Sequence, residues 1–190
     1  MGGGETVRHK VFLGLYPDGE VACAARQAAA GRGLTPVGRP HVSLVGLGDN
    51  STPPPQRWID RVAAAASRVR RPPFLIELNT ITSFKRTRGG LWPIVLGGED
   101  GVIGVSLLCD AILSALAAEG LGGRPARTPH LTVSWSDRPV QEQKIGPLRW
   151  VAHEFVLIDS LHGAGRHEVL GRWPLESETA DASDRVGGGH

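Results

Sequence analysis

The chain has 190 residues, of which 41% are hydrophobic, so it is long enough for one domain with its own core. A formal net charge of +2 does not indicate a general nucleic-acid-binding protein, although the preference for Arg over Lys leaves room for local basic patches. Cys23 and Cys109 are the only cysteines, which argues against a disulfide framework or a cysteine metal site. The apolar run at residues 11–16 is far too short to span a membrane, so we expect a cytoplasmic protein without a membrane partner.

The two ends of the chain differ in composition from the middle. Residues 1–8 include Gly2-Gly3-Gly4 and are predicted to form a flexible arm, and the polar, Gly-ended residues 176–190 are predicted to form a disordered tail. Residues 9–175 remain as one domain, which we expect to be monomeric.

The first half of that domain is predicted to run strand, helix, strand, helix over residues 10–16, 18–30, 41–47 and 51–69. Asp18 is the expected N-cap of the first helix and Gly31 its end. The second helix is expected to open at Ser51 or Thr52, because short hydroxyl side chains cap helix N-termini.

The second half is predicted to contain strands at 74–81 and 92–96, an amphipathic helix at 101–120 and a strand at 131–135. A closing hairpin with strands 150–159 and 168–175 is expected around Gly163-Ala164-Gly165. Each half therefore has a strand, a helix and a second strand in the same order. This order suggests an internal structural duplication and an α+β fold with mixed or antiparallel sheets.

A short pattern occurs once in each half, as Pro40-His41-Val42-Ser43 and as Pro129-His130-Leu131-Thr132. Side chains alternate between the two faces of a strand, so the His and the hydroxyl residue two positions later point to the same side. Two such pairs facing one another would supply a general acid, a general base and two hydrogen-bond donors for an anion held between them. This combination is suited to phosphate ester chemistry.

These residues resemble the two-histidine (2H) phosphoesterase superfamily, and within it the LigT-like RNA 2',3'-cyclic phosphodiesterases, also called 2'-5' RNA ligases. The resemblance extends from the early strand Val11-Phe12-Leu13-Gly14-Leu15 through Pro93-Ile94-Val95-Leu96 to the closing segment 155–175. The chain departs from the family pattern at Ser43, where Thr is commoner, at Gly46, often aromatic, and at Trp135, which replaces an Arg often found a few residues after the second motif.

The resemblance implies a bilobal α+β fold with two pseudo-symmetric lobes, each with a mainly antiparallel sheet and packed helices, and an active-site cleft between them. The carried-over catalytic residues are His41, Ser43, His130 and Thr132. By analogy with the family, His41 is the acid toward the leaving 3' oxygen and His130 the base toward water, which gives a 2'-phosphate product. The two hydroxyl groups would bind the phosphoryl oxygens. No cofactor is implied, and two His without a third or fourth ligand do not make a zinc site.

The expected partner is RNA or an oligonucleotide that carries a 2',3'-cyclic phosphate end. Its phosphates are candidates for contact with a basic loop and with two arginines that precede the second motif, and its bases for stacking on an indole. These candidate substrate-binding residues are Lys85, Arg86, Arg88, Arg124, Arg127 and Trp135. The remaining histidines lack the hydroxyl two positions later and are interpreted as surface, strand or tail residues, with His167 the least secure of them.

Three alternatives remain open from the sequence. The same residues could ligate tRNA-like RNA halves through a 2'-5' bond, because hydrolysis and ligation differ in the nucleophile that is bound. The substrate could be another small cyclic nucleotide or a 2'-5' oligonucleotide. The chain could also be an RNA-binding module that has lost turnover, although both motifs are intact.

Overall fold

A computed structural model describes residues 7–87, 89–162 and 166–176. Most of the predicted arm at 1–8 and of the predicted tail at 176–190 lies outside these residues, as do Arg88 and the predicted turn at 163–165. The helices are α1 (Gly19–Ala30), α2 (Gln56–Ala66), the 3-10 helix η1 (Asp100–Val102) and α3 (Ile103–Ala118). The strands are β1 (Arg8–Leu15), β2 (Val42–Asn50), β3 (Phe74–Ser83), β4 (Trp92–Gly97), β5 (Arg124–Pro125), β6 (Leu131–Ser136), β7 (Gln143–Ala152), β8 (Glu154–His162) and β9 (Arg166–Pro174).

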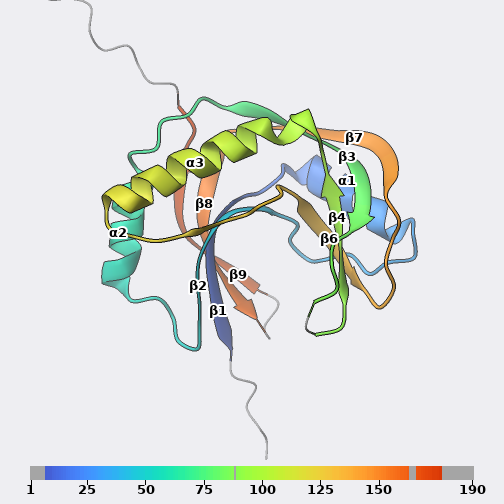
Figure 1. Ribbon diagram of the computed structural model, residues 1–190, viewed down its shortest axis with the longest axis horizontal. Coiled ribbons are helices and arrows are strands. Elements are labelled where there is room, and N and C mark those ends of the chain that lie inside the picture. The colour runs from blue at the N-terminus through green and yellow to red at the C-terminus, as the bar shows by residue number, and fades with distance from the viewer. Residues whose placement is uncertain (1–6, 88, 163–165, 177–190) are drawn as a thin grey trace, which may run out of the picture.

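The strands form one sheet in the order β7-β3-β4-β6-β2-β1-β8-β9, with the short β5 paired to β2 (Figure 1). All of the strand pairs are antiparallel. The sheet has two halves of four strands, β7-β3-β4-β6 and β2-β1-β8-β9. These halves meet at β2 and β6, where Val42 and Leu131 are the registered pair. Both residues directly follow a motif histidine, so the joint between the halves brings the two motifs together.

The two faces of the sheet have different roles, which follow from strand alternation. Leu13, Leu44, Leu96 and Leu131 are fully buried on one face, and the helices cover this face to form the core. The α1 helix packs on β6 and β7, whereas α3 packs across β2 and β3 and against α2. The motif residues alternate with core residues, so they point to the opposite face.

The predicted helices are present, with shifted ends. Asp18 caps α1 as predicted, because its side chain accepts a hydrogen bond from the Val21 N–H (2.9 Å). The second helix begins at Gln56 rather than at Ser51 or Thr52, because three prolines, Pro53 to Pro55, precede it and the last of them occupies the N-cap.

The β7 strand was not predicted, and its last residues were expected to belong to the same strand as β8. The expected strand over residues 150–159 is divided at His153: β7 lies at one edge of the sheet, and β8 lies in the other half-sheet between β1 and β9. The β7 strand is an edge strand whose side chains are mostly exposed and which contains Gly146 and Pro147. It therefore lacks the alternating pattern of a half-buried strand.

The segment Asp100–Ala118, which contains α3, is long and apolar enough to cross a membrane by length and composition alone. In the fold, Val105, Leu108, Ile112 and Leu116 of this helix are buried in the core cluster of the sheet. This packing accounts for the buried face of α3, whereas Ile103 and Leu107 of the same helix are exposed.

Candidate active site

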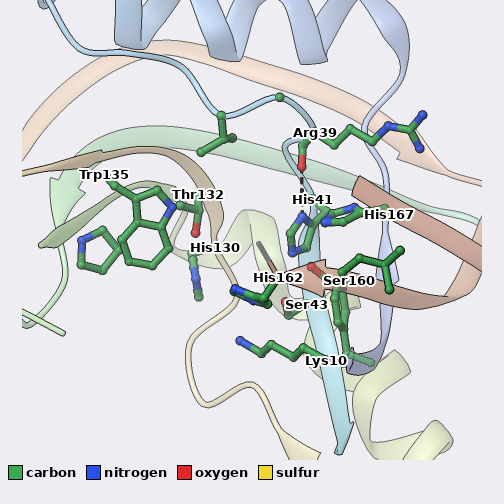
Figure 2. Close-up of a pocket in the computed structure, with 15 residues that line it drawn as sticks. Lys10, Arg39, His41, Ser43, His130, Thr132, Trp135, Ser160, His162 and His167 are labelled. Carbon is green, nitrogen blue, oxygen red and sulfur yellow. Dashed lines mark hydrogen bonds between the residues drawn. The ribbon is translucent and has the colours of Figure 1, made fainter. Parts of the chain in front are cut away.

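A pocket of about 480 Å³ lies on the face of the sheet opposite the core helices. Residues of both half-sheets line it: His41 and Ser43 from the β2 side and His130 and Thr132 from the β6 side (Figure 2). The structure thus brings the four predicted catalytic residues together in one cavity. The other residues that line it are Lys10, Phe12, Val37, Gly38, Arg39, Pro93, Trp135, Ser160, Leu161, His162 and His167.

The His41 ring is held by its own backbone and by two aromatic neighbours. Its Nδ1 lies 3.1 Å from the carbonyl oxygen of Arg39. Phe12 stacks on the ring with a centroid distance of 4.9 Å, and His167 makes an edge contact at 5.0 Å. A carbonyl oxygen only accepts hydrogen bonds, so Nδ1 carries the proton and Nε2 of the neutral ring is a free base.

The His130 ring is held in the same way by its backbone and by one aromatic neighbour. Its Nδ1 lies 2.7 Å from the carbonyl oxygen of Thr128, and Phe84 contacts the ring at 4.6 Å with an interplanar angle of 64°. In both motifs the accepting carbonyl belongs to the residue before the proline. The proline fixes its own φ and favours an extended conformation of the residue before it. This geometry directs the carbonyl of that preceding residue toward the imidazole that follows the proline. Both Nε2 atoms are thereby left for a ligand.

The segment before the first motif is attached to the second motif strand. Ser134, which is fully buried on β6, donates a hydrogen bond to the Thr35 carbonyl (2.7 Å), and the Val37 N–H donates to the Val133 carbonyl (2.9 Å). This attachment fixes the position of Arg39, whose carbonyl orients His41. The two motifs are therefore connected through the backbone as well as through the sheet.

Burial lowers the pKa of both motif histidines. For His41 the pKa falls from 6.5 to about 4, because burial disfavours the imidazolium more than the Arg39 carbonyl favours it. Repulsion from Lys10, and from His167 and His130 when these rings are protonated, lowers the pKa further. Burial also lowers the pKa of His130. The hydrogen bond to the Thr128 carbonyl favours the charged ring and partly offsets this effect. Both imidazoles are therefore neutral at pH 7 in the free protein.

Several residues that line the pocket were not predicted as site residues, among them Lys10, Ser160 and His167. These three belong to β1, β8 and β9, and strand pairing rather than any sequence spacing brings them together. His167 was interpreted as a surface or strand residue, whereas its Nδ1 lies 3.0 Å from the Tyr16 hydroxyl and its ring contacts His41. That interpretation of His167 was incomplete, because β9 reaches the site only through its pairing with β8.

Of the predicted substrate-binding residues, the structure places Trp135 in the lining of the pocket. Its side chain is 48% exposed and lies beside His130 and Thr132 (Figure 2). Lys85, Arg86, Arg124 and Arg127 are exposed and do not line the pocket. The Arg86 Nε donates to the Gly90 carbonyl in the β3–β4 loop (2.6 Å), and Arg124 pairs with Gly46 of β2.

Among the described residues, no group of three or more His, Cys, Asp or Glu side chains is arranged to hold a metal ion. The described residues that line the pocket also include no Asp or Glu. The donors in the pocket are imidazole, ammonium, hydroxyl and indole groups, which suit an anionic ligand.

The fold and the paired motifs define a two-histidine phosphoesterase. The family model of the 2'-5' RNA ligase superfamily matches residues 17–164, so the chain belongs to this superfamily. Membership supports a phosphoesterase or ligase activity. A search of curated proteins gave no match.

Solved structures show the same fold at low sequence identity. Apo LigT from E. coli has a TM-score of 0.71 at 22% identity, with 90% of this chain and 99% of that chain covered. E. coli LigT complexed with 3'-AMP has a TM-score of 0.71 at 23% identity, with 88% and 98% covered. TT0787 of Thermus thermophilus has a TM-score of 0.69 at 23% identity, with 89% and 99% covered. These similarities confirm the predicted LigT-like α+β fold.

Proposed function

We propose that the protein is a metal-independent phosphodiesterase that hydrolyses the 2',3'-cyclic phosphate end of RNA or an oligonucleotide to a 2'-phosphate. The observation that carries this proposal is the matched anchoring of His41 and His130, each by Nδ1 to the carbonyl two residues earlier. Two oriented imidazoles with free Nε2 atoms supply one acid and one base across a cavity that contains donors for an anion.

In this mechanism the cyclic phosphate lies between the two motifs. Ser43 and Thr132 donate hydrogen bonds to its non-bridging oxygens, where negative charge is stabilised in the transition state. His130 removes a proton from water as the water oxygen bonds to phosphorus. The bond from phosphorus to the 3' oxygen breaks, and His41 donates a proton to that oxygen.

The assignment of His41 as acid and His130 as base comes from the family resemblance and not from the pKa shifts. Burial lowers the pKa of both rings, so both are neutral at pH 7 in the free site. The acid therefore has to gain its proton when the substrate binds. A phosphodiester brings a negative charge into the pocket, and this charge raises the pKa of both rings, so that one of them takes up the proton required for catalysis.

Trp135 and the cavity size support a nucleotide as the ligand. The indole is half exposed at the pocket, where a base can stack on it, and single-stranded nucleic acids are commonly bound in this way. The E. coli LigT structure with 3'-AMP shows that a protein of this fold accommodates a nucleotide.

The test is hydrolysis of a nucleoside 2',3'-cyclic phosphate, and of a short RNA with that end, in the presence of EDTA. Wild type is compared with His41→Ala and His130→Ala, and chromatography separates 2'- from 3'-phosphate products. We expect turnover to the 2'-phosphate that is lost in both variants. A folded wild-type protein that turns over neither substrate, or a chelator that abolishes the activity, contradicts the proposal.

Ligation is the second candidate, because the matching family is named for 2'-5' RNA ligation. In that reaction an RNA 5'-hydroxyl group replaces water as the nucleophile at the same site. Product analysis with and without a 5'-hydroxyl acceptor RNA distinguishes the two: a 2'-5'-linked product that forms only with the acceptor identifies ligation, and a 2'-phosphate in both reactions identifies hydrolysis.

A further inference from the structure

Lys10, Ser160 and His167 form a row across three adjacent strands. Lys10 on β1 is the registered partner of Ser160 on β8, and Ser160 is the registered partner of His167 on β9. Directly paired residues of neighbouring strands project from the same face of a sheet. We call these three residues the donor row.

The donor row lies inside the pocket but is separate from the two motifs. All three residues line the cavity, and His162 lies beside Lys10 and Ser160, with the Lys10 ammonium pointing toward the cavity (Figure 2). An ammonium, a hydroxyl group and an imidazole can each donate a hydrogen bond to an anion. No carboxylate among the described lining residues neutralises these donors.

Tyr16 orients the imidazole of the row. The Tyr16 hydroxyl lies 3.0 Å from Nδ1 of His167. A phenol can donate to this nitrogen or accept from it, so the contact holds the ring in place for either tautomer. It leaves Nε2 of His167 for a ligand.

The row begins next to the site of the reaction. The His167 ring is 5.0 Å from the His41 ring, and neighbouring strands are about 4.8 Å apart, so Lys10 lies about two strand spacings from His167. A pocket of about 480 Å³ is within the range of small-molecule sites and is larger than a single phosphate requires. The cavity therefore has space for the nucleoside that would connect the two anion sites.

We propose that the donor row binds a second phosphoryl group of the substrate, one nucleoside away from the phosphate that reacts between His41 and His130. The inference rests on the proposed function, which it deepens by specifying the substrate class. The preferred substrate is then a nucleotide or oligonucleotide end with a phosphate on the 5' side of the terminal nucleoside. A nucleoside 2',3'-cyclic phosphate without a 5'-phosphate occupies only the site between His41 and His130 and leaves the donor row empty.

Binding of two product analogues tests this proposal without requiring turnover. Calorimetry compares adenosine 2'-monophosphate with adenosine 2',5'-bisphosphate in wild type, Lys10→Met and His167→Phe. Lys10→Met removes the charge and keeps the exposed apolar stem, and His167→Phe keeps an aromatic ring beside His41 but removes the donor. Lys144→Met is the matched control, because Lys144 is exposed on β7 and pairs with Glu99 outside the pocket.

We expect the bisphosphate to bind wild type about 10- to 100-fold more tightly than the monophosphate, the gain typical of one or two charge-assisted hydrogen bonds. This ratio should fall to within about threefold in Lys10→Met and should decrease in His167→Phe, while Lys144→Met keeps the wild-type ratio. Thermal unfolding of each variant verifies that it is folded.

Equal affinities in wild type, or a preference that survives in Lys10→Met, would overturn the proposal. These outcomes are separate from a failure of the proposed function. Turnover of a cyclic phosphate without a preference for the bisphosphate rejects the donor row alone. A bisphosphate preference that depends on Lys10, without turnover of any cyclic phosphate, rejects the hydrolytic activity and leaves the second anion site.

Discussion

The two motif histidines share one backbone arrangement but lie in different surroundings. Both imidazoles bond through Nδ1 to the carbonyl before a proline. His41 also contacts two rings, Phe12 and His167, and Lys10 disfavours its charged form, whereas His130 contacts the single ring of Phe84. The shared arrangement fixes the orientation of both bases, and the different surroundings set their proton affinities apart. A pair with separated affinities can divide the roles of acid and base.

The largest expected effect tests whether the two histidines have different roles. His41→Asn and His130→Asn should each lower kcat by about 10²- to 10⁴-fold on a 2',3'-cyclic phosphate, because each removes one proton-transfer group. With a sulfur atom in place of the 3' oxygen, the leaving group needs no proton, so His41→Asn should regain most of its activity and His130→Asn should not. Initial rates on both substrates measure this difference.

His153→Asn is the control for these rates, because His153 is exposed between β7 and β8 and does not line the pocket. Rescue of His130→Asn instead of His41→Asn would reverse the assignment of acid and base. Equal rescue of both variants would show that the different surroundings do not separate the roles.

The motif hydroxyls test whether the two halves of the site bind the phosphate equally. Ser43→Ala and Thr132→Val should each lower kcat by about 10²-fold, since each removes a donor to a phosphoryl oxygen, while Thr132→Ser should retain most of the activity. Steady-state kinetics measures kcat and KM separately. If Thr132→Val raised KM alone, its hydroxyl would hold the substrate without stabilising the transition state.

The pH dependence of kcat/KM reports the pKa values of the catalytic acid and base in the free protein. The active form has one protonated and one neutral imidazole. Because the pKa of His41 is about 4 and that of His130 is lowered below 6.5, the profile should be bell-shaped with its maximum on the acid side of pH 6.5. Above the maximum, kcat/KM should fall about tenfold per pH unit as the pair loses its last proton. A maximum above pH 7 would contradict this expectation.

Burial of His41 also affects stability. The unfolded chain binds a proton on His41 near pH 6.5 and the folded chain only near pH 4, so the stability of the fold decreases as the pH falls through this window. The contribution of His41 amounts to about 2 kcal/mol between pH 7 and pH 5. Urea unfolding at both pH values should show this decrease in wild type and a smaller one in His41→Asn. The same decrease in both proteins would assign it to other groups.

The smallest expected effect tests whether Phe12 and Phe84 each influence the pKa of a different histidine. Phe12→Leu should let water reach His41, raise its pKa and move the acid limb of the kcat/KM profile upward by less than about one pH unit. Phe84→Leu should raise the pKa of His130 and move the alkaline limb upward instead. If both variants moved the same limb, the two rings would not act on separate histidines. Unfolding measurements of both variants control for the loss of packing.

The sequence was sufficient for residues that are related by local spacing. His41 shares a strand face with Ser43, and His130 with Thr132, because side chains on a strand alternate with a period of two. A proline precedes each histidine, and the carbonyl before that proline orients the ring. The helix ended by Gly31 was also predictable, because caps are read over a few residues. The basic loop at Lys85 and Arg86 showed the limit of composition, since its charge said nothing about its distance from the pocket.

Only the tertiary structure decided which residues from distant parts of the chain lie together in the pocket, because strand register controls their positions. Lys10 and His167 are 157 positions apart in the chain, and only the pairing of β1 with β8 and of β8 with β9 puts them on one face beside His41. Register depends on the packing of a whole sheet against its helices, and a shift of one residue would move these side chains to the core face. The proton affinity of His41 was also decided at this level, because its cause is burial among residues from distant parts of the chain. The sequence by itself determined the chemistry of the two motifs, whereas the fold determined the environment in which that chemistry takes place.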